Sequence, residues 1–261
     1  MRILAVGDVV SFSGREFIYS FLSKIKEKYE IDFCVVNGEN SANTNGITSE
    51  IAKKIFESGA DVVTLGNHAF SNKGIFQAFD SKNLIRPINY PPKVEGAGYV
   101  IFNLKGLKIL VVNVLGRALM NLQLDCPFRT VNKLFWRINK MYDISVLDFH
   151  AETTSEKIAF ANYFDSRINI IFGTHTHIQT ADERVLPGGT GYITDLGMTG
   201  VVDSVIGVKK EIIINSFLTG KKYRFEKAVG DACLCGAIFD INPESKNINS
   251  IERIVVFKED F

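Results

Sequence analysis

The feature that most constrains this chain is a short apolar run that ends in two histidines. Ile168 to Phe172 is rich in β-branched residues and short enough to be a buried strand, and Gly173-Thr174-His175-Thr176-His177 follows it directly. Open α/β sheets keep their chemistry where a strand ends and a loop begins. Residues two apart in an extended segment point to the same side, so we expect His175 and His177 to offer two imidazoles to one small volume. Such a pair suits metal binding.

Other strand-like runs end in the same way. The chain has only four histidines, and each lies just after an apolar run: His68, His150, His175 and His177. Two further runs end in acidic and amide residues, Gly7-Asp8 and Asn37-Gly38-Glu39-Asn40. Any one histidine alone would be interpreted as a hydrogen-bonded residue near a strand end. Five strand ends that all carry metal-competent side chains favour a shared site instead.

Length and charge limit the classes of protein that fit. A chain of 261 residues with 46% hydrophobic residues can bury a substantial core, and no Pro/Gly/Ser-rich linker or charge block divides it. We therefore expect one domain over residues 1–261. A formal net charge of +1 provides no global basic field for nucleic acid, so any such binding would have to be local.

The cysteines lack the paired spacing of a thiolate metal site. Cys34 lies inside an apolar run, and we interpret Cys233 and Cys235 as two thiols on one strand face. We expect a reduced, cytoplasmic protein, because Met1 leads directly into the first strand and no apolar run approaches membrane-spanning length.

Strand and helix patterns alternate along the chain. Helical spacing is expected over Gly14 to Lys28, from near Thr48, over Phe128 to Met141 and over Ser155 to Ser166. Strands are expected at Arg2 to Val6, Phe33 to Val36, Val62 to Leu65, Tyr99 to Asn103, Leu107 to Val114, Tyr192 to Thr194, Cys235 to Ile241 and Ile251 to Phe257. Asn43 to Gly46 is expected to form only a turn. The aromatic helix that carries Trp136 is interpreted as core or as a subunit contact.

The ordered motifs resemble those of the calcineurin-like metallophosphoesterases, and more narrowly of their bacterial YmdB-type branch. Five motifs carry the resemblance: Gly7-Asp8, Asn37-Gly38-Glu39-Asn40, Gly66-Asn67-His68, Asp148-Phe149-His150-Ala151-Glu152 and Gly173-Thr174-His175-Thr176-His177. The narrower branch is indicated by Gln179 to Arg184, Leu186 to Thr190, Thr194 to Gly200 and Asp203 to Gly207. The similarity covers nearly the whole chain.

The resemblance implies a particular fold and site. The fold would be α/β, a four-layer α-β-β-α sandwich of two mixed sheets packed face to face with helices outside. A two-metal centre would lie at the strand ends, with one ion held by Asp8, Glu39 and His177, joined by Asn40, and the other held by Glu39, Asn67, His150 and His175. Glu39 would bridge the two ions. Oxygen and imidazole ligands favour iron or manganese, with zinc as the alternative.

The resemblance also implies a reaction. A phosphodiesterase acting on small phosphate esters is expected, with 2′,3′-cyclic or 3′,5′-cyclic AMP as the leading substrates. Two divalent ions activate water and stabilise charge during in-line displacement, and His68 would protonate the leaving oxygen as general acid. A homo-oligomer is expected from the same resemblance, and the lack of a membrane-spanning apolar run predicts no membrane contact.

Three positions depart from the family pattern. Val10 stands where the first motif usually has histidine, Ser11 stands where glycine is usual, and Ser71 stands where an aspartate usually follows Gly-Asn-His. If that aspartate normally orients His68, Ser71 favours an alternative function, a regulatory protein that senses a nucleotide or a partner with weak or no turnover. A metal-dependent hydrolase of a non-phosphate ester or amide is the third hypothesis.

Overall fold

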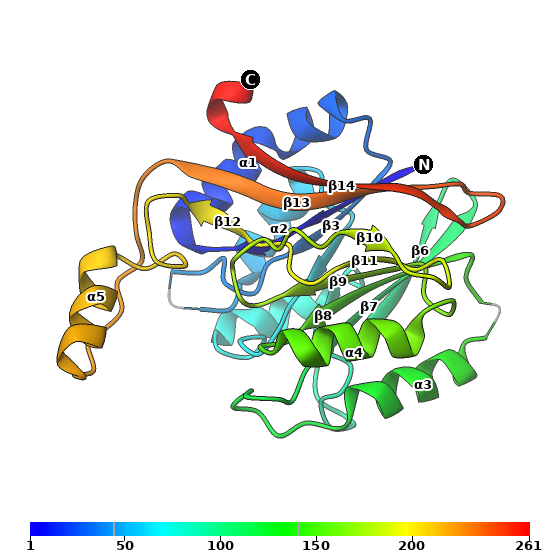
Figure 1. Cartoon of the computed structure of the whole chain (residues 1–261), viewed down its shortest axis with the longest axis horizontal. Coiled ribbons are helices and arrows are strands. Elements are labelled where there is room, and N and C mark those ends of the chain that lie inside the picture. The colour runs from blue at the N-terminus through cyan, green and yellow to red at the C-terminus, as the bar shows by residue number, and fades with distance from the viewer. Residues whose placement is uncertain (44, 140) are drawn as a thin grey trace.

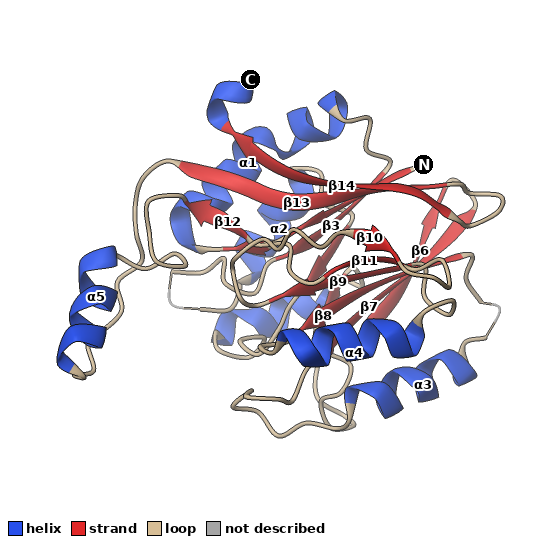
Figure 2. Cartoon of the chain, viewed as in Figure 1, coloured by secondary structure: helices blue, strands red, loops and turns tan. Residues whose placement is uncertain are grey.

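Two β-sheets lie face to face, with helices on their outer surfaces (Figures 1 and 2). The computed structural model describes residues 1–43, 45–139 and 141–261. The expected four-layer α-β-β-α sandwich is confirmed. Among the described residues, no helix combines the length and the apolar character needed to cross a membrane.

The first sheet has eight strands and is built around the N-terminal strand. Its parallel part comprises β1 (Arg2–Val6), β3 (Phe33–Asn37), β4 (Val62–Thr64) and β5 (Leu84–Ile85). β13 (Ala232–Ile241) pairs antiparallel with β1, with β14 (Ile248–Phe257) and with β12 (Met198–Val201), which also pairs with β2 (Asp8–Val9). Strands from both ends of the chain therefore lie in one sheet. The expectation of one domain over residues 1–261 stays a prediction.

The second sheet has six strands. Its four parallel strands are β7 (Leu107–Leu115), β8 (Ile144–His150), β9 (Ile170–Thr174) and β11 (Gly191–Ile193). β6 (Tyr99–Leu104) and β10 (Arg184–Val185) close its edges in antiparallel pairs. Lys105 and Gly106 form the turn that joins β6 to β7, two strands that the sequence predicts.

Four helices cover the outer faces. α1 (Ser11–Lys28) and α2 (Ser49–Glu57) pack on the first sheet, and α3 (Pro127–Arg137) and α4 (Thr154–Phe164) pack on the second. The side chains of Thr48 and Thr153 cap α2 and α4 by accepting backbone N–H bonds, which explains why these helices begin there. The third expected helix ends at Arg137 instead of Met141. Two residues of expected elements lie outside the described residues: Lys140 in this helix and Thr44 in the expected turn.

A fifth helix was not expected. α5 (Lys210–Thr219) has no buried residue and stands apart from the sandwich in Figure 1. Its three consecutive isoleucines, Ile212 to Ile214, give no one-sided helical stripe, so the pattern that identifies a helix packed on a sheet is missing. In the part of the chain that the structure describes there are also two 3₁₀ segments, η1 (Lys73–Asp80) and η2 (Lys258–Asp260).

The central strands are buried on both faces. In β1, Ile3 and Ala5 pack in the core between the sheets, while Leu4 and Val6 pack under the helices. This double burial explains the nearly continuous apolar runs in the sequence. The candidate ligands follow at the carboxyl ends of β1, β3, β4, β8 and β9, where the apolar runs stop.

Candidate metal centre

Ligand atoms from both sheets converge at the carboxyl ends of the strands. One ligand atom from each of Glu39, His150 and His175 lies within 4.8 Å of the others. The Nε2 atom of His150 is 2.9 Å from Glu39 Oε1, 3.0 Å from His175 Nδ1 and 3.0 Å from Asn67 Oδ1. Ligands bound at about 2.0–2.2 Å to one ion lie roughly 3 Å apart, so this spacing fits a metal ion.

A second group lies beside the first. Asp8 is fully buried, and its Oδ1 atom is 3.7 Å from Nε2 of His177. The amide nitrogen of Asn40 is 3.2 Å from that imidazole nitrogen and 3.5 Å from both Asp8 Oδ1 and Glu39 Oε1. The amide N–H groups of Asn40 therefore face three atoms that offer electron pairs. A cation could be bound by the same three atoms.

All seven predicted ligands thus lie at one edge of the sandwich: Asp8, Glu39, Asn40, Asn67, His150, His175 and His177. Their individual roles as ligands stay predictions. For Asn40, coordination would require the side-chain oxygen, whereas the nitrogen faces the group in this structure.

The loop after β9 reaches the site by a route that the sequence did not predict. β9 ends at Thr174, and the φ angles of His175 and His177 are 103° and 64°, both in the left-handed region. The expected extended conformation is therefore wrong, although both imidazoles lie at the candidate centre. The ring of His175 faces His150 and Glu152, while Nδ1 of His177 lies 3.0 Å from the carbonyl oxygen of Ile206. Such backbone strain costs on the order of 1–3 kcal/mol per residue and concentrates at functional sites.

Burial disfavours the charged forms of the carboxyl and imidazole groups at the site. It raises the pKa of both carboxyl groups, Asp8 and Glu39, and lowers the pKa of His150 and His175 to about 4. The two imidazoles are therefore neutral near pH 7, and their electron pairs are available to a metal ion. A divalent cation would compensate for the cost of burying the carboxylates, and this chemistry fits the donor set.

A buried hydroxyl fixes the tautomer of His150. Thr174 Oγ1 donates to Asp148 Oδ1 at 2.7 Å and lies 2.8 Å from Nδ1 of His150. The hydroxyl hydrogen is used on the carboxylate, so Nδ1–H of His150 donates to the hydroxyl and the Nε2 electron pair faces the site. Asp148 also accepts from Thr64 and Asn37, and burial raises its pKa to about 7. The sequence motif contained Asp148, but its spacing gave no sign of this role.

A buried ion pair holds the loop that carries His175 and His177. Lys157 Nζ lies 2.6 Å from Asp195 Oδ2, and both side chains are buried. The same carboxylate accepts from the backbone N–H and the hydroxyl of Thr176, at 3.1 and 2.7 Å, and from the backbone N–H of Gly197. Sequence reasoning missed this role, because α4 and the segment after β11 meet only in the folded chain.

His68 lies at the edge of the centre. Its backbone N–H donates to Glu39 Oε2 at 2.9 Å, and its Nδ1 atom is 3.2 Å from the hydroxyl oxygen of Ser71. Ser71 therefore keeps a hydrogen-bonding partner beside the imidazole but contributes no negative charge. The catalytic role of His68 stays a prediction.

The chain is similar to known proteins over almost its whole length. A family model described as YmdB-like protein matches residues 4–254. A protein of Bacillus subtilis (strain 168) named 2′,3′-cyclic-nucleotide 2′-phosphodiesterase is 42% identical over 257 residues, which are 98% of this chain and 97% of that protein.

Two solved structures share the fold. A novel phosphatase from Mycoplasma pneumoniae aligns with a TM-score of 0.93 and 34% identity over 98% of this chain and 93% of that one. A hypothetical protein from Thermus thermophilus aligns with a TM-score of 0.91 and 37% identity over 98% and 99% of the two chains.

The ion pair under the histidine loop predicts a large stability effect. Lys157→Met leaves the carboxylate of Asp195 buried without its countercharge, and we expect it to lower the free energy of unfolding by about 3–5 kcal/mol in urea denaturation. Lys53→Met is the matched control, because Lys53 pairs with Glu57 at 3.7 Å on the exposed face of α2 and should change stability by no more than about 0.5 kcal/mol. Equal, small losses in both variants would contradict the assigned role.

Proposed function

The chain belongs to the YmdB-like protein family, and on that premise we propose that it is a metal-dependent phosphodiesterase acting on small phosphate esters. The observation that carries the proposal is the buried convergence of Glu39, His150 and His175 at the strand ends. The name of the Bacillus subtilis relative favours 2′,3′-cyclic nucleotides. The proposed substrate is therefore 2′,3′-cyclic AMP, with 3′,5′-cyclic AMP as the alternative.

Two ions would occupy the centre in this proposal. Asp8, Glu39, Asn40 and His177 would hold one, and Glu39, Asn67, His150 and His175 the other. Oxygen and imidazole donors without thiolate favour iron or manganese, with zinc as the alternative. When bound, such ions supply activation of water and neutralisation of the charge on phosphoryl oxygens.

The protein side chains supply position and a proton. His68 protonates the leaving oxygen, and the hydroxyl of Ser71 steadies its Nδ1 side at 3.2 Å. The bond from the backbone N–H of His68 to Glu39 fixes the distance between the acid and the centre. His150 keeps its Nε2 electron pair toward the site through Thr174.

The first test is hydrolysis of bis-p-nitrophenyl phosphate with manganese after the protein has been stripped with a chelator. We expect wild-type turnover, a loss of about 10²–10⁴-fold in His68→Ala with metal retained, and loss of both metal and turnover in Glu39→Ala. Glu244→Ala, which removes an exposed carboxylate, is the control and should behave as wild type. Full metal content together with activity in Glu39→Ala would refute the assignment.

A second candidate function follows from Ser71. Because a hydroxyl and not a carboxylate contacts His68, the centre could bind a nucleotide or a partner and turn it over slowly or not at all. Such a sensor and an enzyme differ in their response to one substitution.

Ser71→Asp separates the two functions. A carboxylate beside Nδ1 would raise the basicity of the imidazole. We expect a change of less than about threefold in kcat if the chain is an ordinary enzyme, because geometry then limits the proton transfer. A gain of about 10²-fold or more would favour the sensor, and Ser71→Ala measures the contribution of the hydroxyl alone.

We also propose that the chain forms a homo-oligomer. A helix of ten residues is marginal on its own in water, and α5 buries none of its residues against the sandwich. Phe217 and Leu218 on this helix are 85% and 78% exposed, and Trp136 on α3 is 87% exposed. Contact with a second copy would bury these side chains.

Light scattering tests the assembly. We expect a wild-type mass that is a multiple of the 29.1 kDa chain and a shift toward 29.1 kDa in a Phe217→Asp, Leu218→Asp variant. A monomeric wild-type protein would contradict the proposal. Lys222→Asp, on the exposed segment after α5, controls for added charge.

A further inference from the structure

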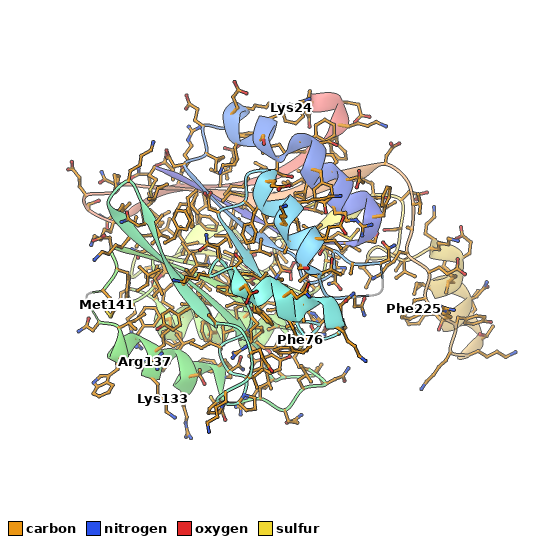
Figure 3. All side chains as sticks on the ribbon, turned by 180° about the vertical axis from the view of Figure 1, so that it is seen from behind. Lys24, Phe76, Lys133, Arg137, Met141 and Phe225 are labelled. Carbon is orange, nitrogen blue, oxygen red and sulfur yellow. The ribbon has the colours of Figure 1, made fainter. Side chains whose placement is uncertain are left out.

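A pocket of about 490 Å³ opens beside the metal centre. One wall is the start of α1 with Ser11 and Phe12, and the other is the extended segment from Arg224 to Val229 that returns from α5 to the sandwich. Figure 3 shows Phe225 on this returning segment, next to the projecting helix. Among the described residues that line this pocket, none is assigned to the phosphodiesterase reaction.

The pocket and the metal centre share a wall. The backbone N–H of Ser11 donates to the carbonyl oxygen of Asn40 at 2.8 Å. Lys227 pairs with Val208, two residues from the Ile206 carbonyl that lies against His177. Burial lowers the pKa of Lys227, and the carboxylate of Glu39 counteracts this shift, so the ammonium group lies within the field of the centre. The pocket and the candidate metal centre are therefore neighbours, in contact through Ser11 and Asn40.

Two aromatic rings line the pocket and remain open to solvent. Phe12 is 51% exposed and Phe225 is 62% exposed. The guanidinium of Arg15 lies 5.2 Å from the centroid of the Phe12 ring and is held by Ser41 and Asn43 at 2.9 and 3.1 Å. Exposed rings of this kind are platforms on which nucleobases stack.

The charge of the returning segment is strongly basic. Its sequence Lys221-Lys222-Tyr223-Arg224-Phe225-Glu226-Lys227 alternates cations with aromatic residues, and its one acid, Glu226, is paired with Lys209 at 2.6 Å. A cyclic mononucleotide carries a single phosphate, which the metal centre would bind, so it offers no anion to these cations. A second phosphate one nucleotide away would offer such an anion. Cations interleaved with aromatic rings are also typical of proteins that bind single-stranded nucleic acid.

We propose that this pocket binds the nucleotide that precedes a terminal cyclic phosphate, so that the substrate class includes the 3′ ends of single-stranded RNA as well as mononucleotides. The base stacks on Phe12 and Phe225, and the connecting phosphate lies against Lys227 and Arg224. This inference rests on the proposed phosphodiesterase function and adds to it a reason for the charge of the returning segment.

Hydrolysis of a 2′,3′-cyclic phosphate at the 3′ end of RNA needs water as its only co-reactant. Cleavage of RNA by attack of the 2′-oxygen on the adjacent phosphorus releases a 5′-hydroxyl and leaves a 2′,3′-cyclic phosphate. Hydrolysis at the 2′ position adds hydroxide to phosphorus, breaks the bond from phosphorus to the 2′-oxygen and gives that oxygen a proton. The reaction class that supplies the substrate is therefore endonucleolytic transesterification, and the product is a 3′-phosphate.

Kinetics on matched substrates test the pocket. We expect kcat/KM for the dinucleotide adenylyl-adenosine 2′,3′-cyclic phosphate to exceed that for adenosine 2′,3′-cyclic phosphate at least about tenfold, mainly through KM. Phe225→Ala should bring this ratio close to one. Tyr223→Ala is the matched control, because Tyr223 lies on the same segment but does not line the pocket, and it should keep the wild-type ratio.

Binding provides a second measurement that does not depend on turnover. The probe is a 5′-fluorescein-labelled pentaadenylate with a 3′-phosphate, followed by anisotropy with metal-loaded protein. We expect Phe225→Ala to bind about tenfold more weakly, and Arg224→Gln to reduce the salt dependence of binding by the equivalent of about one phosphate contact.

The outcomes separate this inference from the function on which it rests. Equal kcat/KM for the two cyclic substrates in an active wild-type enzyme, or equal losses in Phe225→Ala and Tyr223→Ala, would overturn the pocket alone. Wild-type protein that hydrolyses neither substrate would overturn the phosphodiesterase function. The anisotropy of Phe225→Ala then decides on the pocket, with weaker binding supporting it and unchanged binding refuting it.

Discussion

The buried carboxylate of Glu39 is the group around which the rest of the site is arranged. Its side chain is fully buried at the end of the segment that follows β3, where an uncompensated charge would cost several kcal/mol. One oxygen accepts the backbone N–H of His68, and the other lies 2.9 Å from His150 Nε2 on the opposite sheet. Both atoms offer electron pairs, so a cation between them would join the two sheets at their carboxyl ends.

Two buried networks keep this arrangement rigid, one on each side of the centre. Asp148 and Thr174 orient the ring of His150 through a chain of hydrogen bonds of 2.7 and 2.8 Å. Asp195, paired with Lys157, holds Thr176 between the two histidines of the strained loop. The strained φ angles of His175 and His177 persist because the hydrogen bonds from Thr176 to Asp195 hold the loop in place. The imidazoles then need little rearrangement to bind a metal ion.

The sequence predicted the parts of the fold that depend on local pattern. The β1 strand over Arg2–Val6 and the start of α2 near Thr48 follow from local pattern, and the ordered motifs placed the candidate ligands at one edge. It did not predict α5, whose apolar residues face solvent, or the positive φ angles of His175 and His177. Nor did it predict the role of Asp195, because the partner Lys157 lies 38 residues away and is brought close only by packing. The missed features depend on tertiary contacts and backbone strain, which hydrophobic periodicity does not record.

The two serine departures from the family pattern act on different steps. Ser71 contacts His68 and would therefore bear on proton transfer in the proposed mechanism. Ser11 lines the neighbouring pocket and has a φ angle of 58°, in the region that glycine adopts without steric cost, which fits the expectation that glycine stands here in the family. Its side chain adds a hydroxymethyl group to a wall that continues into the metal centre. In the proposed function, Ser71 would therefore act on the rate of the chemical step, whereas Ser11 would act on which esters bind and would leave the predicted metal ligands unchanged.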